Sequence, residues 1–210
     1  MGSAMKVLYV CTANICRSPL AAGLLRQAAV PGVQVASAGT RAVVGMPGCS
    51  VPSHRSVPLS PEALAWADLV LTAAREHQAA VVELDPGARQ RTFTIKQAGR
   101  LSDWLRSAGM VAAARAPGQY PEGDPRRFVA PLPTVGRTDW LVAELDAARG
   151  MAPVPVEPVA VGRRRRRTET PHVDDIPDPH VLGDEWHPVA REQIVAATGQ
   201  LVALLGELTR

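Results

Sequence analysis

A strand, an anion-binding loop and a helix follow one another directly near the N-terminus of this chain. The apolar run Val7-Leu8-Tyr9-Val10 predicts a buried strand, and Pro19 suits the first turn of a helix that continues through Leu24 and Leu25. Cys11 stands where the strand ends, so the backbone N–H groups after it turn toward the helix N-terminus. Convergent N–H groups and the positive end of a helix dipole bind dianions such as phosphate.

The side chains of this loop supply a nucleophile and a clamp for the bound anion. The positive environment favours the thiolate of Cys11, which is the reactive form of a cysteine. Arg17 can fold back over the loop and hold two phosphate oxygens with its planar guanidinium. Ser18 can donate a hydrogen bond to the thiolate and so improve it as a leaving group. The other residues expected to surround the phosphate are Thr12, Ala13, Asn14, Ile15 and Cys16.

The stretch Cys11-Thr12-Ala13-Asn14-Ile15-Cys16-Arg17-Ser18-Pro19 resembles the signature Cys-x-Gly-Asn-x-Cys-Arg-Ser-Pro of the low-molecular-weight protein tyrosine phosphatases. The resemblance implies hydrolysis of protein phosphotyrosine through a phosphocysteine intermediate, with Cys11 as the nucleophile and Arg17 as the phosphate clamp. It implies phosphorylated proteins or phosphate esters as substrates, phosphate, sulfate or vanadate as ligands of the loop, and no metal or cofactor. Ala13 departs from the signature, which has glycine at this position. The methyl group of Ala13 would cost about 1 kcal/mol if the position required a positive φ.

The resemblance also requires a general acid in an Asp-Pro-aromatic motif near the C-terminus. Asp178 occupies the matching position in Asp174-Asp175-Ile176-Pro177-Asp178-Pro179-His180, and His180 replaces the Tyr or Phe expected beside the substrate ring. Such a carboxyl group protonates the departing phenolate and then takes a proton from the attacking water. On local sequence alone, the competing acids are Asp174, Asp175 and Asp184.

Two later segments also resemble the family residue by residue. Ala36-Ser37-Ala38-Gly39-Thr40 matches a segment after the second strand, and Ser53-His54-Arg55-Ser56 matches one whose histidine joins a hydrogen-bond network. The resemblance therefore assigns Ser37 and His54, together with the loop asparagine and serine, as supports of the loop conformation. On local sequence alone, Ser37 would be a polar turn residue and His54 a surface histidine.

The alternation of strand and helix patterns predicts an α/β fold. Strands are expected over 5–10, 33–37, 67–72 and 91–94, and helices over 18–29, 61–66, from 75 onward, 95–114 and 188–210. This order predicts a central, four-stranded, parallel twisted sheet with helices on both faces. The phosphate-binding loop would lie at the C-terminal end of the first strand, where such sheets bind ligands. A single domain over 5–210 is expected, because 210 residues that are 46% apolar can bury a sizeable core.

One wall of the expected cleft is shorter than the resemblance implies. Between Gly45 and His54, the family has a helix and an aromatic-bearing loop, whereas this chain has only eight residues. Two prolines and a glycine among the eight disfavour a helix. The wall is therefore expected to be shortened or built from elsewhere.

An insertion is expected at about 117–172. Asp139–Arg149 predicts a helix with Thr138 as its N-cap. Met151–Gly162 alternates proline and valine, which favours an extended arm over a packed element. The five consecutive arginines Arg163–Arg167 are either a solvated charge run or an electrostatic collar that attracts anionic substrates.

Composition and charge narrow the expected location and partners. No run approaches the roughly 18 apolar residues of a membrane span, and the N-terminus lacks a secretion signal, so a cytoplasmic protein without a membrane partner is expected. Residues 1–4 look like a cloning remnant. A formal charge of only +3, with no aromatic residues among the arginines, disfavours a nucleic-acid partner.

Several alternatives to a tyrosine phosphatase are open. Phosphoarginine-specific relatives are expected to carry Thr where this chain has Ile15, and a small-metabolite phosphatase would fit the shortened wall. A non-catalytic phosphate-binding module would not need both Cys11 and Asp178. An arsenate reductase is disfavoured, because its relay needs further cysteines and none follows Cys49.

The chain has three cysteines, which predict no disulfide framework. Cys16 is interpreted either as a guard that forms a reversible disulfide with Cys11 or as a small buried residue. Cys49 is expected to be a bystander thiol. The sequence contains no recognisable cluster of metal ligands.

Overall fold

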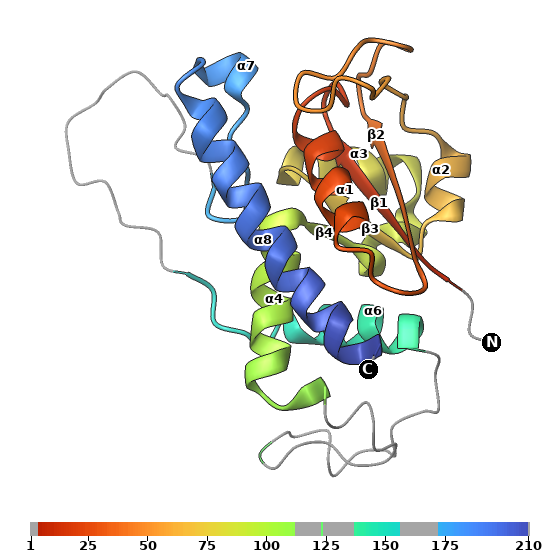
Figure 1. Cartoon of the computed structure of the whole chain (residues 1–210). Helices are drawn as coiled ribbons and strands as arrows, with labels where there is room; N and C mark the ends of the chain where they lie inside the picture. The colour runs from red at the N-terminus through yellow and green to blue at the C-terminus, as the bar shows by residue number, and fades with distance from the viewer. Residues whose placement is uncertain (1–3, 112–122, 124–136, 156–171, 210) are drawn as a thin grey trace.

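A parallel sheet forms the centre of the computed structural model, which describes residues 4–111, 123, 137–155 and 172–209 (Figure 1). The strands follow the order β2-β1-β3-β4, and every neighbouring pair is parallel. Their bounds are β1 Met5–Cys11, β2 Val33–Gly39, β3 Leu69–Thr72 and β4 Thr92–Thr94. The register pairs Cys11 with Gly39 and Val10 with Thr72, so the strands end together at one edge. The predicted four-stranded α/β fold is confirmed.

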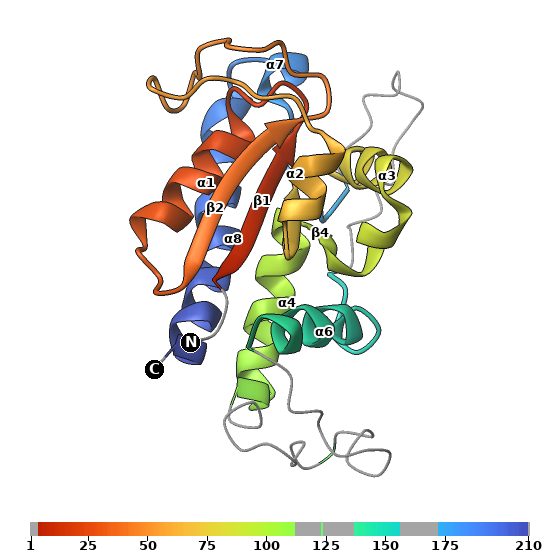
Figure 2. The same cartoon turned by 90° about the vertical axis from the view of Figure 1, so that its right-hand side faces the viewer.

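Helices cover both faces of this sheet (Figure 2). Their bounds are α1 Arg17–Gln27, α2 Pro61–Trp66, α3 Arg75–Leu84, α4 Ile95–Ser107, α6 Arg137–Ala148, α7 Pro179–Leu182 and α8 Trp186–Thr209, with a 3₁₀ helix, η1, over Pro86–Arg91. Alternate residues of β1 face opposite sides. Val7 and Tyr9 pack in one core with α1, α4, α6 and α8, whereas Leu8 and Val10 pack with α2 and α3.

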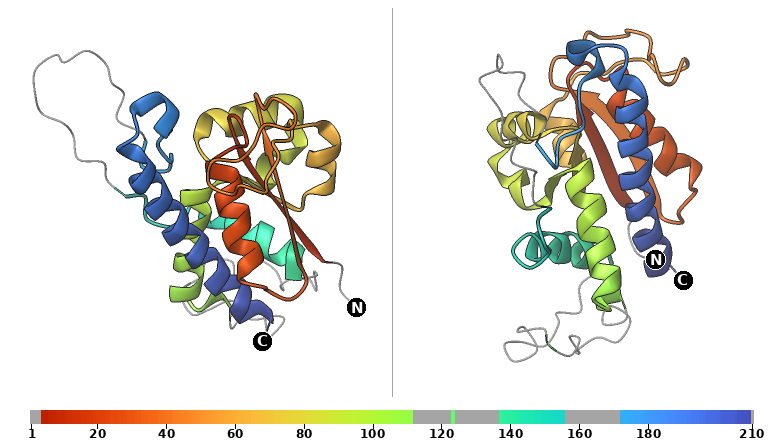
Figure 3. Two further views of the ribbon diagram at one scale, coloured as in Figure 1. Left: turned by 45° about the horizontal axis from the view of Figure 1, so that its top comes forward. Right: turned by 90° about the vertical axis from the view of Figure 1, so that its left-hand side faces the viewer.

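The C-terminal helix α8 runs beside α4 and α1 (Figure 3). Gly99 on α4 permits this contact, because a Cβ atom there would lie only 2.8 Å from the Cα atom of Ala197 on α8. The buried residues of α8 are Ala190, Ile194, Ala197, Thr198, Leu201, Leu204, Leu205 and Leu208. Within the described residues, no helix combines the length and apolar character needed to cross a membrane.

Two predicted helix bounds were wrong. The helix expected over 95–114 ends as α4 at Ser107, because the chain turns at Gly109, whose φ is +73°. The helix expected from Asp139 begins at Arg137, so Thr138 lies inside α6 rather than at its N-cap. The short helix predicted over 61–66 is confirmed as α2.

The helix of the expected insertion packs into the main core, where α6 contacts α4 and η1. Leu141 and Leu145 of α6 are fully buried in the main core. Arg149 follows α6, donates a hydrogen bond to the Thr92 carbonyl oxygen at 2.6 Å and stacks 3.8 Å above the ring centre of Phe93. The end of the proline- and valine-rich stretch and the five arginines lie outside the described residues, so the single-domain organisation and the role of the arginines stay predictions.

Candidate active site

The loop between β1 and α1 takes its shape from Asn14 rather than from its neighbour Ala13. Asn14 has a φ of 55°, whereas Ala13 is not among the described residues with a positive φ. Asparagine enters this left-handed region more readily than other residues with a side chain. The methyl group of Ala13 therefore imposes no backbone strain on the loop.

A buried hydrogen-bond chain connects Asn14 to the candidate nucleophile. The Asn14 side-chain amide donates to the Ser18 hydroxyl at 2.9 Å, and that hydroxyl donates to the Cys11 Sγ atom at 3.0 Å. The Asn14 Oδ1 atom accepts from the Val57 backbone N–H at 2.9 Å and from His54 Nε2 at 3.0 Å. Cys11, Asn14 and Ser18 are all buried. The structure thus places three of the four expected supporting residues, Asn14, Ser18 and His54, in one hydrogen-bond chain that ends at the sulfur.

The fourth expected support, Ser37, is not part of this chain. Ser37 pairs with Tyr9 inside the sheet, and its hydroxyl makes no hydrogen bond with another described residue. The same segment supports the loop through Gly39 instead. A Cβ atom on Gly39 would lie 2.7 Å from the Thr12 carbonyl oxygen and 2.8 Å from the Asn14 backbone nitrogen. Only glycine permits β2 to end directly beneath the loop.

Asn14→Ala is expected to lower the free energy of unfolding by about 1–3 kcal/mol, because buried partners of the amide lose their hydrogen bonds. The left-handed backbone at this position adds to the loss, since alanine tolerates it less well. Urea unfolding measures the change. Ser37→Ala is the matched control, and its effect should stay within about 0.5 kcal/mol. Equal losses in the two variants would contradict the assigned network.

The guanidinium of Arg17 lies beneath the acidic loop that precedes α7. Its two terminal nitrogens donate to the Ile176 carbonyl oxygen at 3.2 Å and to the Thr12 hydroxyl at 3.1 Å. Arg17 also forms an ion pair with the Asp178 carboxylate. The second oxygen of Asp178 accepts from the His180 backbone N–H at 3.1 Å, which places Asp178 at the N-cap of α7. Residues 161 positions apart therefore meet over the loop.

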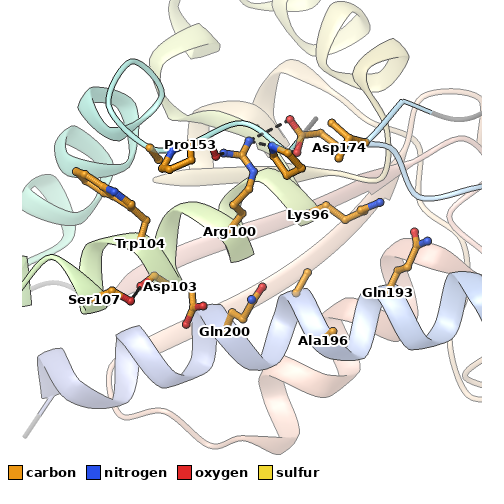
Figure 4. Close-up of a pocket in the computed structure, with 14 residues that line it drawn as sticks. Lys96, Arg100, Asp103, Trp104, Ser107, Pro153, Asp174, Gln193, Ala196 and Gln200 are labelled. Carbon is orange, nitrogen blue, oxygen red and sulfur yellow. Dashed lines mark hydrogen bonds and ion pairs between the residues drawn. The ribbon is translucent and has the colours of Figure 1, made fainter. Parts of the chain in front are cut away.

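The four candidate acids separate clearly in space. Asp174 pairs with Arg100 on α4 at 3.2 Å, beside a cavity of about 540 Å³ (Figure 4). Asp175 accepts from the backbone N–H of Arg75 at 2.9 Å, at the start of α3. Asp184 is fully exposed. Among these four, only Asp178 reaches Arg17 and the phosphate loop.

The sequence comparisons agree with this geometry. A sequence model described as low molecular weight phosphotyrosine protein phosphatase matches residues 6–109. A protein-arginine-phosphatase of Geobacillus stearothermophilus is 41% identical over 104 residues, which are 44% of this chain and 70% of that relative. The chain belongs to the low molecular weight phosphotyrosine protein phosphatase family. The predicted resemblance is thereby confirmed.

Other members of the family extend the comparison. The low molecular weight protein-tyrosine-phosphatase Etp of Escherichia coli K12 is 37% identical over 103 residues, which are 43% of this chain and 69% of Etp. The solved YwlE arginine phosphatase of G. stearothermophilus aligns with a TM-score of 0.54 and 25% identity over 95% of this chain and 91% of its own. Wzb from E. coli K30, solved with phosphate, shares the fold with a TM-score of 0.54 and 18% identity over 94% and 96% of the two chains.

His77 belongs to this site, although no sequence motif pointed to it. It lies on α3 with 2% of its surface exposed, and its Nε2 atom is 2.9 Å from the Thr12 hydroxyl oxygen. Its Nδ1 atom accepts from the Ala74 backbone N–H, so Nε2 carries the proton and donates to Thr12. Burial, and then the charge of Arg17, lower the pKa of His77 to about 4. Arg17 and neutral His77 thus both donate hydrogen bonds to the Thr12 hydroxyl oxygen. The proton of the Thr12 hydroxyl is therefore left to donate to a bound phosphate.

The depressed pKa of His77 predicts a pH-dependent stability. In the unfolded chain, this histidine has a pKa of about 6.5. Between pH ~6.5 and ~4, the unfolded chain therefore binds a proton at this histidine that the folded protein does not bind. The stability that neutral His77 contributes is therefore complete above pH ~6.5 and is lost as the pH falls toward ~4. Urea midpoints across this range should fall less in His77→Gln than in the parent. His187→Gln is the control, because this histidine is 40% exposed, and it should follow the parent curve.

Cys16 and Cys49 are joined in a disulfide, which corrects the expectation that Cys49 is a bystander thiol. Cys11 is free and buried, so Cys16 is bonded here to Cys49 rather than to Cys11, and a reversible guard bond between Cys11 and Cys16 stays one of the two interpretations of Cys16. Cys49 is no bystander, because its sulfur bonds Cys16 and its backbone N–H donates to the Ile15 carbonyl oxygen at 2.9 Å. The short segment around Cys49 forms turns and no helix, as predicted, and it packs directly against the phosphate loop.

The remaining expected residue, His180, lies at the rim of the site. It is exposed, and its Nε2 atom lies 3.1 Å from the Cys16 sulfur. A cavity of about 420 Å³ opens beside it, lined by Cys16, Arg17, Cys49 and His187 among others. The site therefore consists of a nucleophile, a clamp and a carboxyl group at the sheet edge, with an open space next to them.

Proposed function

We propose that this phosphatase hydrolyses protein phosphotyrosine through a phosphocysteine intermediate. The observation that carries the proposal is the meeting of three groups at one edge of the sheet. Cys11 accepts a hydrogen bond from Ser18, and Arg17 is paired with the carboxylate of Asp178. Solved relatives of the same fold hold phosphate, sulfate or benzylphosphonate, which supports a phosphate-ester ligand. We therefore expect phosphate, sulfate and vanadate to bind the loop of this chain as well.

In the first step, the thiolate of Cys11 attacks the phosphorus atom in line with the ester oxygen. A phosphorus–sulfur bond forms as the phosphorus–oxygen bond breaks, and Asp178 gives its proton to the departing phenolate. Arg17 and the N–H groups of the loop stabilise the equatorial oxygens. Arg17 is paired with Asp178 in this structure, so an incoming dianion has to replace this carboxylate on the guanidinium.

In the second step, water hydrolyses the phosphocysteine. Asp178 takes a proton from the attacking water, the phosphorus–sulfur bond breaks, and inorganic phosphate leaves. The Ser18 hydroxyl, 3.0 Å from the Cys11 sulfur, stabilises the thiolate as it departs. No cofactor enters either step. Because the nucleophile must stay a free thiol, we propose that the protein works in the reducing cytoplasm, where the disulfide between Cys16 and Cys49 would be open.

Phosphoarginine is the second candidate substrate. A relative that is 41% identical is a protein-arginine-phosphatase, so the family likeness alone does not separate the two substrates. Ile15 favours phosphotyrosine, because the resemblance places threonine at this position in phosphoarginine-specific relatives. The shortened wall would also accept a small phosphate ester.

The test compares kcat/KM for a phosphotyrosine peptide, a phosphoarginine peptide and a small phosphate ester, with vanadate as inhibitor. We expect the phosphotyrosine peptide to be preferred by at least about tenfold, the scale of discrimination by one pocket contact. Ile15→Thr should reduce this preference, whereas Ile15→Val, which has the same shape as threonine without the hydroxyl, should retain it. A preference for phosphoarginine in the parent would establish the second candidate, and turnover of none of the three would indicate a binding module.

A further inference from the structure

Three residues of metal-binding type meet beside the phosphate loop, although they are far apart in the sequence. The ligand atoms of Cys16, Cys49 and His180 all lie within 4.8 Å of one another. Each comes from a different segment: the loop itself, the short wall after β2, and α7. Figure 2 shows α7 and the segment after β2 at the same end of the molecule. The spacing of these residues along the chain does not indicate this cluster, because the fold brings them together.

We propose that Cys16, Cys49 and His180 form a Zn²⁺ site when the two cysteines are reduced. Two thiolates and an imidazole are ligands that Zn²⁺ prefers. Tetrahedral zinc with Zn–S bonds of about 2.3 Å holds its sulfurs ~3.8 Å apart, so the two sulfurs, which are bonded in this structure, have to separate before the ion binds. The fourth position is taken by water or by His187, whose ring centre lies 5.6 Å from that of His180.

The cavity and the charges around Cys16, Cys49 and His180 are compatible with a bound Zn²⁺ ion. The cavity of about 420 Å³ is lined by both cysteines and by His187, so it gives an entry path from solvent. Cys49 and His180 are exposed, which leaves their side chains free to adjust. Two thiolates neutralise the charge of Zn²⁺, and the charge of nearby Arg17 is already compensated by Asp178.

The ion and the disulfide exclude each other, because they use the same two sulfurs. A dithiol reductant opens the bond: the sulfur–sulfur bond breaks, Cys16 and Cys49 take up two electrons and two protons, and the reductant becomes a disulfide. Binding of Zn²⁺ to the two thiols then releases their protons. The Cα atoms of the pair are 5.4 Å apart, which is ordinary for a disulfide.

Occupation of the site would hold the candidate acid in place. Cys16 directly precedes Arg17, and His180 lies two residues after Asp178. An ion that bridges Cys16 and His180 therefore fixes Asp178 against Arg17, the arrangement in which the guanidinium is not available to phosphate. We expect Zn²⁺ to inhibit turnover reversibly. The binding itself does not depend on the proposed function, whereas the inhibition does.

The test uses Co²⁺ as a spectroscopic substitute for Zn²⁺ on the full chain, after a phosphine has reduced it until all three cysteines react as thiols. We expect one ion per chain, a thiolate-to-metal charge-transfer band and the visible bands of tetrahedral Co²⁺, all displaced by Zn²⁺. Cys49→Ser should weaken binding by more than about 100-fold, beyond the cost of losing an outer-shell partner. His180→Ala should also weaken it, and it keeps both thiols.

Cys11→Ser is the decisive control, because the nucleophile is itself a thiol that could bind the ion. This variant should bind Co²⁺ as tightly as the parent and with the same spectrum. Loss of the bands in Cys11→Ser, parent-like binding in Cys49→Ser, or absence of the bands in the reduced parent would each overturn the proposal. The spectra are independent of turnover, so an inactive protein would leave this result readable. In an active protein, Zn²⁺ should inhibit Cys49→Ser at least about tenfold less strongly than the reduced parent, with each rate compared with the same protein's rate without the ion.

Discussion

Cys11→Ser is expected to reduce turnover of an aryl phosphate by on the order of 10⁴- to 10⁶-fold, the scale seen when a covalent nucleophile is removed. A serine hydroxyl in this position is protonated and has no base beside it, because the hydroxyl of Ser18 donates toward residue 11 rather than accepting from it. Binding of phosphate or vanadate should survive, since it rests on Arg17 and the backbone N–H groups. Initial rates and calorimetric titration with phosphate measure the two effects separately.

Cys49→Ser is the matched control for this experiment. With both proteins kept reduced, this substitution removes the Cys49 thiol but leaves the nucleophile, so the rate with an aryl phosphate should stay far above that of Cys11→Ser. Substantial turnover by Cys11→Ser would assign the nucleophile elsewhere. Loss of both turnover and phosphate binding would mean that the substitution collapses the loop, in which case Cys11→Ala provides a second variant without a hydroxyl group.

Asp178→Asn is expected to lower kcat by about 10²–10⁴-fold for a substrate with a poor leaving group. An amide oxygen can still accept from the His180 backbone N–H, so the cap of α7 is retained while the transferable proton is lost. The loss should be small for an activated ester such as p-nitrophenyl phosphate, whose leaving group needs no proton. A comparison of kcat across phenols of increasing pKa separates an acid from a merely structural residue.

Two neighbouring carboxylates provide controls for this second prediction. Asp184→Asn should leave kcat unchanged, because this side chain is fully exposed. Asp175→Asn should affect stability more than chemistry, since Asp175 binds the N-terminus of α3. A steeper leaving-group dependence in Asp175→Asn than in Asp178→Asn would show that the acid had been assigned to the wrong aspartate.

The parts of the fold that local patterns govern could be predicted from the sequence. The apolar run before Cys11 and the proline after Ser18 predicted β1 and α1, because strand burial and the first helical turn depend on few neighbours. The end of α4 was missed, since a turn at Gly109 competes with a helical pattern that continues beyond it. The start of α6 was missed for a similar reason: Thr138 can cap a helix but can also lie inside one.

The candidate site was predictable where a motif fixes residues in sequence, and not where the fold alone brings them together. Asp178 could be selected only because of the family resemblance, and its contact with Arg17 became evident only in the structure. His77 has no motif, because its role depends on β3 lying next to β1, which brings the start of α3 against Thr12. The partner of Cys16 was likewise undetermined, since the spacing of cysteines does not specify which two sulfurs meet.

Arg100 holds both ends of the stretch that precedes the acidic motif. Its guanidinium donates to the Pro153 carbonyl oxygen at 3.1 Å and to the Asp174 carboxylate at 3.2 Å (Figure 4). Both Pro153 and Asp174 are therefore fixed to one guanidinium on α4. Because Asp174 lies only four residues before Asp178, Arg100 also limits how far the candidate acid can move away from Arg17.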